Sequence, residues 1–209
     1  KKHKTESKDF KTFMSDYFTG HPMIRDRGEE DTKVWSRLKG EELEIAKQKV
    51  LDELPSDQEY LMRAVAQFKD DRAIPKLQWT AENGKTEHSR CYAAKILFDW
   101  IGYDNYFDKL DEVFKSDNQW SKTSLGYWIS GLKEEDALKY FWTAMNDTDS
   151  FVRFCSYGAL ENYYGIRKFR KDGFEIKYFT DDEVYHDKEL FKQRQMELKE
   201  KIEKWKEKN

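Results

Sequence analysis

The sequence predicts an all-α fold in which about four helix pairs stack as an α-solenoid, with an N-terminal cap and a long C-terminal helix. Apolar residues recur at helical spacing, as in RCYAAKILFDWIG at residues 90–102. A two-helix unit of about 32 residues repeats along the chain. Pro (3) and Gly (10) are scarce among the 209 residues, which argues against an all-β chain with many tight turns.

The repeat is clearest between SRCYAAKILFDWIG and VRFCSYGALENYYG. Arg90 matches Arg153 and Gly102 matches Gly165, so both pairs keep the same spacing. Upstream, DDRAIPKL aligns with EEDALKYF, shifted by one residue because the following loop is shorter in the later copy. An intermediate copy, NYFDKLDEVF followed by SKTSLGYWISGL, puts Lys122 midway between the two arginines.

The earliest copy comprises GEELEIAKQKVLDEL and SDQEYLMRAVAQF. SDQE at residues 56–59 fits a capping box that starts the second helix of this copy. Pro75 suits the first turn of the next helix, where proline is tolerated. Asp147 and Asp149 are candidate N-caps for the last second helix. We therefore expect the repeat domain to cover residues 40–165.

Small residues recur in the second helix of each copy, where neighbouring helices must approach closely. One helix pair has more apolar surface than it can bury, so stacking of pairs would hide the remainder. The small residues expected at these close approaches are Ala64, Ala93, Ala94, Gly126, Ser156, Gly158 and Ala159.

The stretches DDRAIPKL, SRCYAAKILFDWIG and DTDSFVRFCSYGALENYYG resemble HEAT repeats, particularly the short bacterial kind. The shared pattern is an Asp, an apolar-Pro step in the first helix, and then Val-Arg, small residues and Leu in the second. The resemblance covers about 125 residues, from 40 to 165. The middle copy departs most, since it lacks both the Pro and the Val-Arg step.

The flanking segments do not fit the repeat. Residues 1–39 are expected to cap the first repeat with Phe10, Phe13, Tyr17, Phe18 and Trp35, because an end repeat would otherwise expose its core. Residues 166–179 alternate basic and apolar residues, which predicts a loop or a small hairpin. Residues 180–209 start with a capping box, TDDE, and predict one amphipathic helix that packs on the last repeat or on a partner.

Charge and hydropathy limit the classes of partner. The formal net charge is −3 with a pI near 5.9, so the chain lacks the basic footprint of most nucleic-acid-binding proteins. No apolar run is long enough for a membrane span. A cytoplasmic protein is the default expectation. The chain begins at Lys1 rather than Met, so a cleaved signal or lipoprotein anchor stays open.

Recurring cations and aromatic residues predict a partner-binding inner surface. Cations occupy the same place early in three second helices, and the second helices of HEAT-like stacks line the inner curve. Aromatic and arginine side chains are enriched at protein interfaces. A purely structural role is the alternative: the cations would bond to neighbouring repeats and the rings would fill gaps between layers. The candidates are Arg90, Lys95, Trp120, Lys122, Tyr127, Arg153 and Tyr157.

No chemistry-bearing motif is present. The four histidines are far apart, no His/Cys pair has metal-ligand spacing, and no phosphate loop or nucleophile elbow occurs. Cys91 and Cys155 are expected as packing residues rather than as a disulfide or a reactive thiol. We therefore expect no enzymatic activity, no cofactor and no metal. The expected function is a non-catalytic scaffold that binds another protein.

The resemblance to HEAT repeats implies more specific functions. Short HEAT-like domains with a non-repeat N-terminal extension occur among immunity proteins that block bacterial toxins. Some alkylpurine DNA glycosylases are HEAT-like solenoids with Trp and Asp on a basic concave surface, but no matching motif occurs here and the chain is acidic. Some lyase subunits that attach tetrapyrroles to proteins also carry these repeats. The immunity-type inhibitor is the first expectation, and the other two are its alternatives.

Overall fold

A computed structural model describes residues 6–165 and 177–208. The chain is all-helical, with 76% of its residues in helices and no strand in the described ranges. It divides into two compact units, residues 1–112 and residues 113–209. Helix α8 (Tyr106–Lys115) spans the division. None of the helices in the described ranges is long and apolar enough to cross a bilayer.

The first unit begins with short helices that bury a cluster of aromatic rings. The Phe13 ring lies 5.2 Å from Trp35 and 5.4 Å from Tyr17, and the Trp35 ring lies 4.8 Å from Phe68 on α5. Trp35 Nε1 donates a hydrogen bond to the Tyr17 hydroxyl at 3.1 Å. The N-terminal segment therefore covers the end of the helices that follow. Its elements are α1 (Lys8–Met14), η1 (Ser15–Thr19), α2 (Pro22–Asp26) and α3 (Val34–Arg37).

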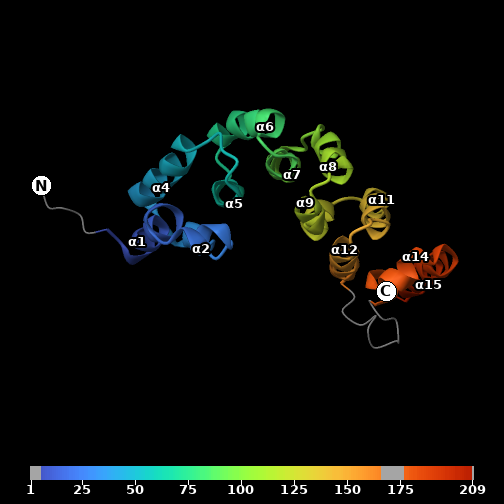
Figure 1. Cartoon of the computed structure of the whole chain (residues 1–209). Coiled ribbons are helices and arrows are strands. Elements are labelled where there is room, and N and C mark those ends of the chain that lie inside the picture. Colours follow the sequence, from blue (N-terminus) through green and yellow to red (C-terminus); the bar gives the residue numbers. More distant parts are fainter. Residues whose placement is uncertain (1–5, 166–176, 209) are drawn as a thin grey trace, which may run out of the picture. The chain divides into compact units, whose positions relative to one another are not determined.

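Two helix pairs follow where the first two copies of the repeat are expected. They are α4 (Gly40–Asp52) with α5 (Glu59–Phe68), and α6 (Ile74–Asn83) with α7 (Glu87–Ile101). The partners of each pair are in contact, and so are the two second helices, α5 and α7 (Figure 1). Ala64 on α5 and Ala93 and Ala94 on α7 are completely buried, as expected for positions of close approach.

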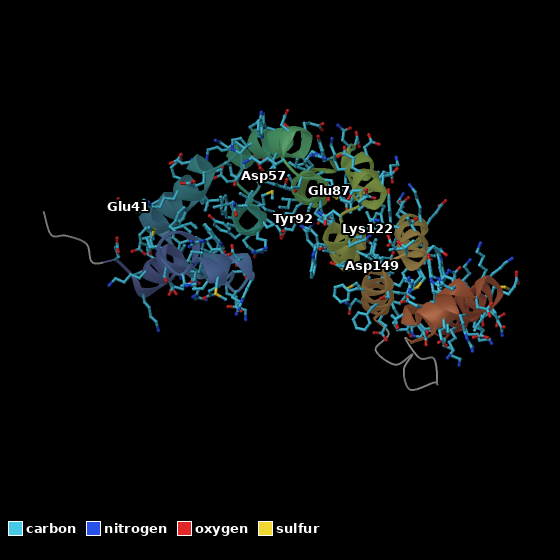
Figure 2. The ribbon with its side chains drawn as sticks, in the orientation of Figure 1. Glu41, Asp57, Glu87, Tyr92, Lys122 and Asp149 are labelled. Carbon is cyan, nitrogen blue, oxygen red and sulfur yellow. The ribbon has the colours of Figure 1, made fainter. Side chains whose placement is uncertain are left out.

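The capping box expected at residues 56–59 does not form. Helix α5 begins at Glu59 after Gln58, which has no side-chain cap. Asp57 instead accepts hydrogen bonds from the Ser89 hydroxyl at 2.6 Å and from the Lys85 backbone N–H at 2.8 Å (Figure 2). Ser56, the expected N-cap, instead accepts a hydrogen bond from the Gln58 backbone N–H at 3.1 Å, and Thr86 with Ser89 forms the capping box of α7.

The second unit contains the later helices of the repeat: α9 (Gln119–Thr123), α10 (Leu125–Ile129), α11 (Glu134–Met145) and α12 (Ser150–Tyr163). One second helix was expected where α9 and α10 lie, and Ser124 divides it. The indole of Trp128 donates to the Ser121 carbonyl at 2.8 Å. This bond links α10 back to α9.

Two of the small residues in this unit have different roles. A Cβ at Gly126 on α10 would lie 3.6 Å from the Ala159 Cβ on α12, so these helices approach closely there. A Cβ at Gly158 would meet no atom within 4 Å. The expected close approach at Gly158 is therefore wrong, because this side of α12 has no described neighbour at that position.

The C-terminal segment contains three helices rather than one: α13 (Lys177–Thr180), α14 (Asp182–His186) and α15 (Lys188–Lys206). Asp187 has an extended backbone and caps α15 through its side chain, so it separates α14 from α15. On α15, Leu198 and Ile202 are buried, and Trp205 packs against Tyr164 at 5.7 Å. The apolar stripe therefore packs within its own unit. The loop or hairpin expected at 166–179 lies mostly outside the described residues, and its end belongs to α13.

Candidate partner-binding surface

The recurring cations bond within the fold. Arg90 Nη1 donates to the carbonyl of Gly84 at 2.7 Å, and Arg153 Nη1 donates to the carbonyl of Asp147 at 2.9 Å. Each acceptor lies six residues before its arginine, so the two equivalent arginines make equivalent bonds. Gly102 and Gly165 also share a left-handed backbone, with φ of 71° and 69°. The correspondence between the two sequence stretches therefore extends to backbone conformation and side-chain bonding.

Each of these cations also reaches an acidic residue of a following element. Arg90 Nε lies 2.9 Å from Glu112, and Lys122 Nζ lies 2.9 Å from Asp147. Arg153 is completely buried and bonds to the Phe179 carbonyl at 2.5 Å and to Asp182 at 3.0 Å. The structure thus supports the structural alternative, in which the cations hold neighbouring helices together.

Lys95 and Tyr157 are also buried. Lys95 Nζ lies 2.5 Å from both carboxylate oxygens of Asp99, one turn further along α7. The Tyr157 ring stacks on Phe179 at 6.0 Å. Four of the seven predicted contact residues, namely Lys95, Lys122, Arg153 and Tyr157, are therefore buried and present no surface to a partner. The prediction of a cationic contact surface is corrected accordingly.

Trp120 is the predicted residue that faces solvent most openly, with 75% of its surface exposed. Tyr127 is half-buried and packs edge-on against Trp128 at 5.2 Å. Phe151 lies 6.1 Å from Trp120 and stacks on Phe154, also at 6.1 Å. Phe151 is 50% and Phe154 is 44% exposed. Trp120, Phe151 and Phe154 form one continuous patch on α9 and α12, which we call the aromatic surface.

The local sequence of α12 explains why these phenylalanines face outward. Helix α12 contacts α9, α10, α11 and α13, two of which, α9 and α11, are labelled beside it in Figure 1, and Val152, Ser156 and Leu160 on α12 are buried. Phe151 and Phe154 lie on the remaining side with the half-buried Cys155 and Gly158. The spacing of this set is that of one face of a helix.

Phe151 and Phe154 were not among the sequence candidates. They could have been found as the apolar residues on α12 that lie opposite Ser156, one of the predicted small residues. The sequence supplies that spacing, but it does not specify which of two apolar faces is left uncovered. Asp149, which accepts hydrogen bonds from the Phe151 and Val152 backbone N–H groups, fixes where the helix starts (Figure 2).

The two cysteine thiols, Cys91 and Cys155, show no sign of activation. Cys91 and Cys155 are free thiols, and burial raises the pKa of both, which disfavours the nucleophilic thiolate. In the described ranges, no group of three or more His, Cys, Asp or Glu side chains could hold a metal ion.

A polar cluster in the first unit connects α5, α7 and the loop before α3. Arg63 Nε lies 2.6 Å from Glu30, and Arg63 Nη1 lies 3.3 Å from Glu59. His88 Nε2 lies 2.8 Å from Glu59, and this hydrogen bond lowers the pKa of the Glu59 carboxyl. These contacts connect α5 to α7 and to the loop before α3.

No protein-family model, curated protein or solved structure matches the chain.

Proposed function

We propose that this protein is a non-catalytic binding module built from HEAT-like helix pairs, and that it recognises another protein through the aromatic surface. An immunity-type inhibitor of a bacterial toxin is the specific version of this proposal. The observation that carries it is the exposure of Trp120, Phe151 and Phe154 as one patch on neighbouring helices.

The aromatic surface is large enough to act as the centre of an interface. An aromatic side chain carries about 150–250 Å² of surface, so the exposed fractions leave roughly 250–400 Å² of ring surface in solvent. Apolar patches of this size are the largest that a typical monomer exposes, and they are often functional. Tryptophan is also among the residues that contribute most to binding energy in protein interfaces.

The HEAT-like part of the proposal is supported by equivalent bonds in equivalent places. Arg90 and Arg153 each bind the carbonyl six residues upstream, and Gly102 and Gly165 share a left-handed backbone. Contacting helix pairs lie where the first, second and fourth copies are expected, namely α4 with α5, α6 with α7, and α11 with α12. The same arginine bond and the same glycine conformation therefore occur in two copies, as expected when one structural unit is repeated along the chain.

The test compares a double variant, Trp120→Ala with Phe154→Ala, with the unchanged chain. Both are used to purify partners from a lysate of the source organism, and each captured protein is then prepared in pure form for titration. We expect the double variant to weaken binding of the true partner by at least about tenfold, since each ring is a candidate anchor. Trp79→Ala is the matched control, because Trp79 is 53% exposed and lies on α6 in the other unit.

Circular dichroism of the double variant must show unchanged helix content, because both rings are exposed and contribute little to the core. Equal binding by the double variant and the unchanged chain would refute the proposal. Salt-sensitive binding to duplex DNA would favour the glycosylase alternative. A coloured, pigment-bound preparation would favour the tetrapyrrole alternative.

A further inference from the structure

Within residues 116–130 and 149–160, which carry the aromatic surface, the charged side chains that are not buried are carboxylates; Lys115, just before the first range, is exposed. Residues 116–130 contain one Lys and no Arg. This residue, Lys122, is buried against Asp147. Residues 149–160 contain one Arg and no Lys, and this residue, Arg153, is completely buried. Asp117, two residues before α9, is exposed, and Asp149 at the start of α12 is half-buried. A partner at this surface therefore meets carboxylates and no exposed cation from these two segments.

The rings themselves add to this preference. The face of an aromatic ring carries partial negative charge and attracts Lys and Arg side chains, and tryptophan does so most strongly. Trp120 has the largest exposed fraction of the large apolar side chains in the described ranges. Ring faces and neighbouring carboxylates thus favour the same kind of partner group.

The exposed rings supply roughly 250–400 Å², which is enough to hold a short segment but is about half or less of the roughly 800 Å² that each partner buries in a stable protein–protein interface. Two copies that met through these rings would also bring the Asp117 and Asp149 carboxylates of both chains together, which costs binding energy through like-charge repulsion.

We infer that the aromatic surface docks a short protein segment in which one or two large apolar side chains are flanked by Lys or Arg. This inference rests on the proposed function and specifies the chemistry of its partner. The apolar side chains pack among Trp120, Phe151 and Phe154. The open space beside Gly158 leaves room for one of them, because no described atom lies within 4 Å of a Cβ at that position. The flanking cations face Asp117, Asp149 and the indole of Trp120.

Selection from a displayed library of random peptides tests this inference even while the natural partner is unidentified. The full-length chain is the target, and binders are counter-selected against the Trp120→Ala, Phe154→Ala double variant to retain those that need the surface. We expect the retained peptides to be enriched in large apolar residues next to Lys or Arg. They should bind the double variant at least about tenfold more weakly.

The charge of the surface is tested with one retained peptide and two charge reversals. Asp117→Lys should weaken its binding several-fold at low salt, and the difference should shrink at high salt. Asp108→Lys is the matched control, because Asp108 is exposed on α8 and belongs to the first unit. It should leave the affinity unchanged.

The reactivity of the half-buried Cys155 thiol reports whether the peptide binds next to it. It lies on the same side of α12 as Phe151, whereas Cys91 is completely buried. A bound peptide should therefore slow the reaction of Cys155 with a maleimide. Unchanged reactivity at a saturating concentration of peptide would contradict docking at this surface.

The outcomes separate this inference from the proposed function. Surface-dependent peptides that are acidic or carry no charge would overturn the inference and leave the proposed function standing. Recovery of no surface-dependent peptide would count against both. Concentration-dependent dimerisation in analytical ultracentrifugation, abolished by the double variant, would overturn the inference in favour of a second copy of the chain.

Discussion

Gly158 illustrates, at the scale of one residue, how a missing side chain can have opposite meanings. The sequence places it among small residues that permit close helix packing, and for Gly126 against Ala159 the structure agrees. At Gly158 no neighbour lies within 4 Å of a Cβ. The glycine therefore contributes open space beside Phe154 and weakens its own helix, since glycine loses more backbone entropy on folding than any other residue.

Gly158→Ala should stabilise the protein by about 0.5–1 kcal/mol, because a helix interior favours alanine and the new methyl group meets no atom. Gly102→Ala should instead destabilise it by about 1 kcal/mol, since Gly102 ends α7 with φ of 71°. Urea unfolding followed by circular dichroism measures both changes. A loss of stability at Gly158 would show that another segment covers this side of α12.

At the scale of helices, one buried arginine connects three elements. Arg153 on α12 donates to the carbonyls of Asp147 and Thr148 before its own helix, and to the Phe179 carbonyl on α13. Its bond to Asp182 reaches α14, but the Asp182 side chain is 72% exposed. The carbonyl bonds should therefore dominate its contribution to stability, since exposed ion pairs are worth little.

Arg153→Met should lower the free energy of unfolding by about 3–5 kcal/mol, because it removes the donor from the buried bond to the Phe179 carbonyl and from two part-buried bonds to the carbonyls of Asp147 and Thr148. Arg90→Met should cost less, since the Arg90 side chain is 25% exposed and water can replace its bonds. Asp182→Ala is the control and should cost less than about 1 kcal/mol. If Asp182→Ala costs as much as Arg153→Met, the ion pair rather than the carbonyl bonds holds the helices together.

For the whole molecule, stability should depend on pH at both extremes. The hydrogen bonds from Arg72 lower the pKa of Asp70 to about 2, and His88 lowers that of Glu59. A carboxyl whose pKa is lower in the folded state stabilises the fold above its unfolded pKa, and this stabilisation disappears as the pH falls. Burial raises the pKa of Tyr17 and Tyr103 to about 12. Their contribution is present below pH 10 and disappears as the pH rises toward 12.

The melting temperature should therefore be highest between these limits and fall below about pH 4 and above about pH 10. Asp70→Asn should reduce the loss of stability between pH 4 and pH 2, because the amide does not titrate in that window. It can still accept the hydrogen bond from the Arg72 backbone N–H. A melting temperature that rises as the pH falls from 4 to 2 would contradict this account.

Local signals in the sequence predicted the helical elements and the equivalence of Arg90 with Arg153, because apolar spacing and repeated motifs depend on residues close along the chain. These local signals failed where a side chain forms its hydrogen bond with a group other than the one that the local pattern predicts. Ser56 bonds to Gln58 and does not cap α5, Asp57 reaches Ser89 in the first turn of α7, and one predicted helix is divided at Ser124 into α9 and α10. Contacts such as that of Asp57 with Ser89 depend on which side chains meet after folding.

The amino-acid pattern was sufficient for the all-helical class, the order of the helix pairs and the positions of the recurring cations. Tertiary packing decided which faces are covered. It buried Lys95, Lys122, Arg153 and Tyr157, and it left Trp120, Phe151 and Phe154 in solvent. The physical reason is that helical spacing specifies which residues share a face, whereas burial depends on the neighbouring helices that pack against that face.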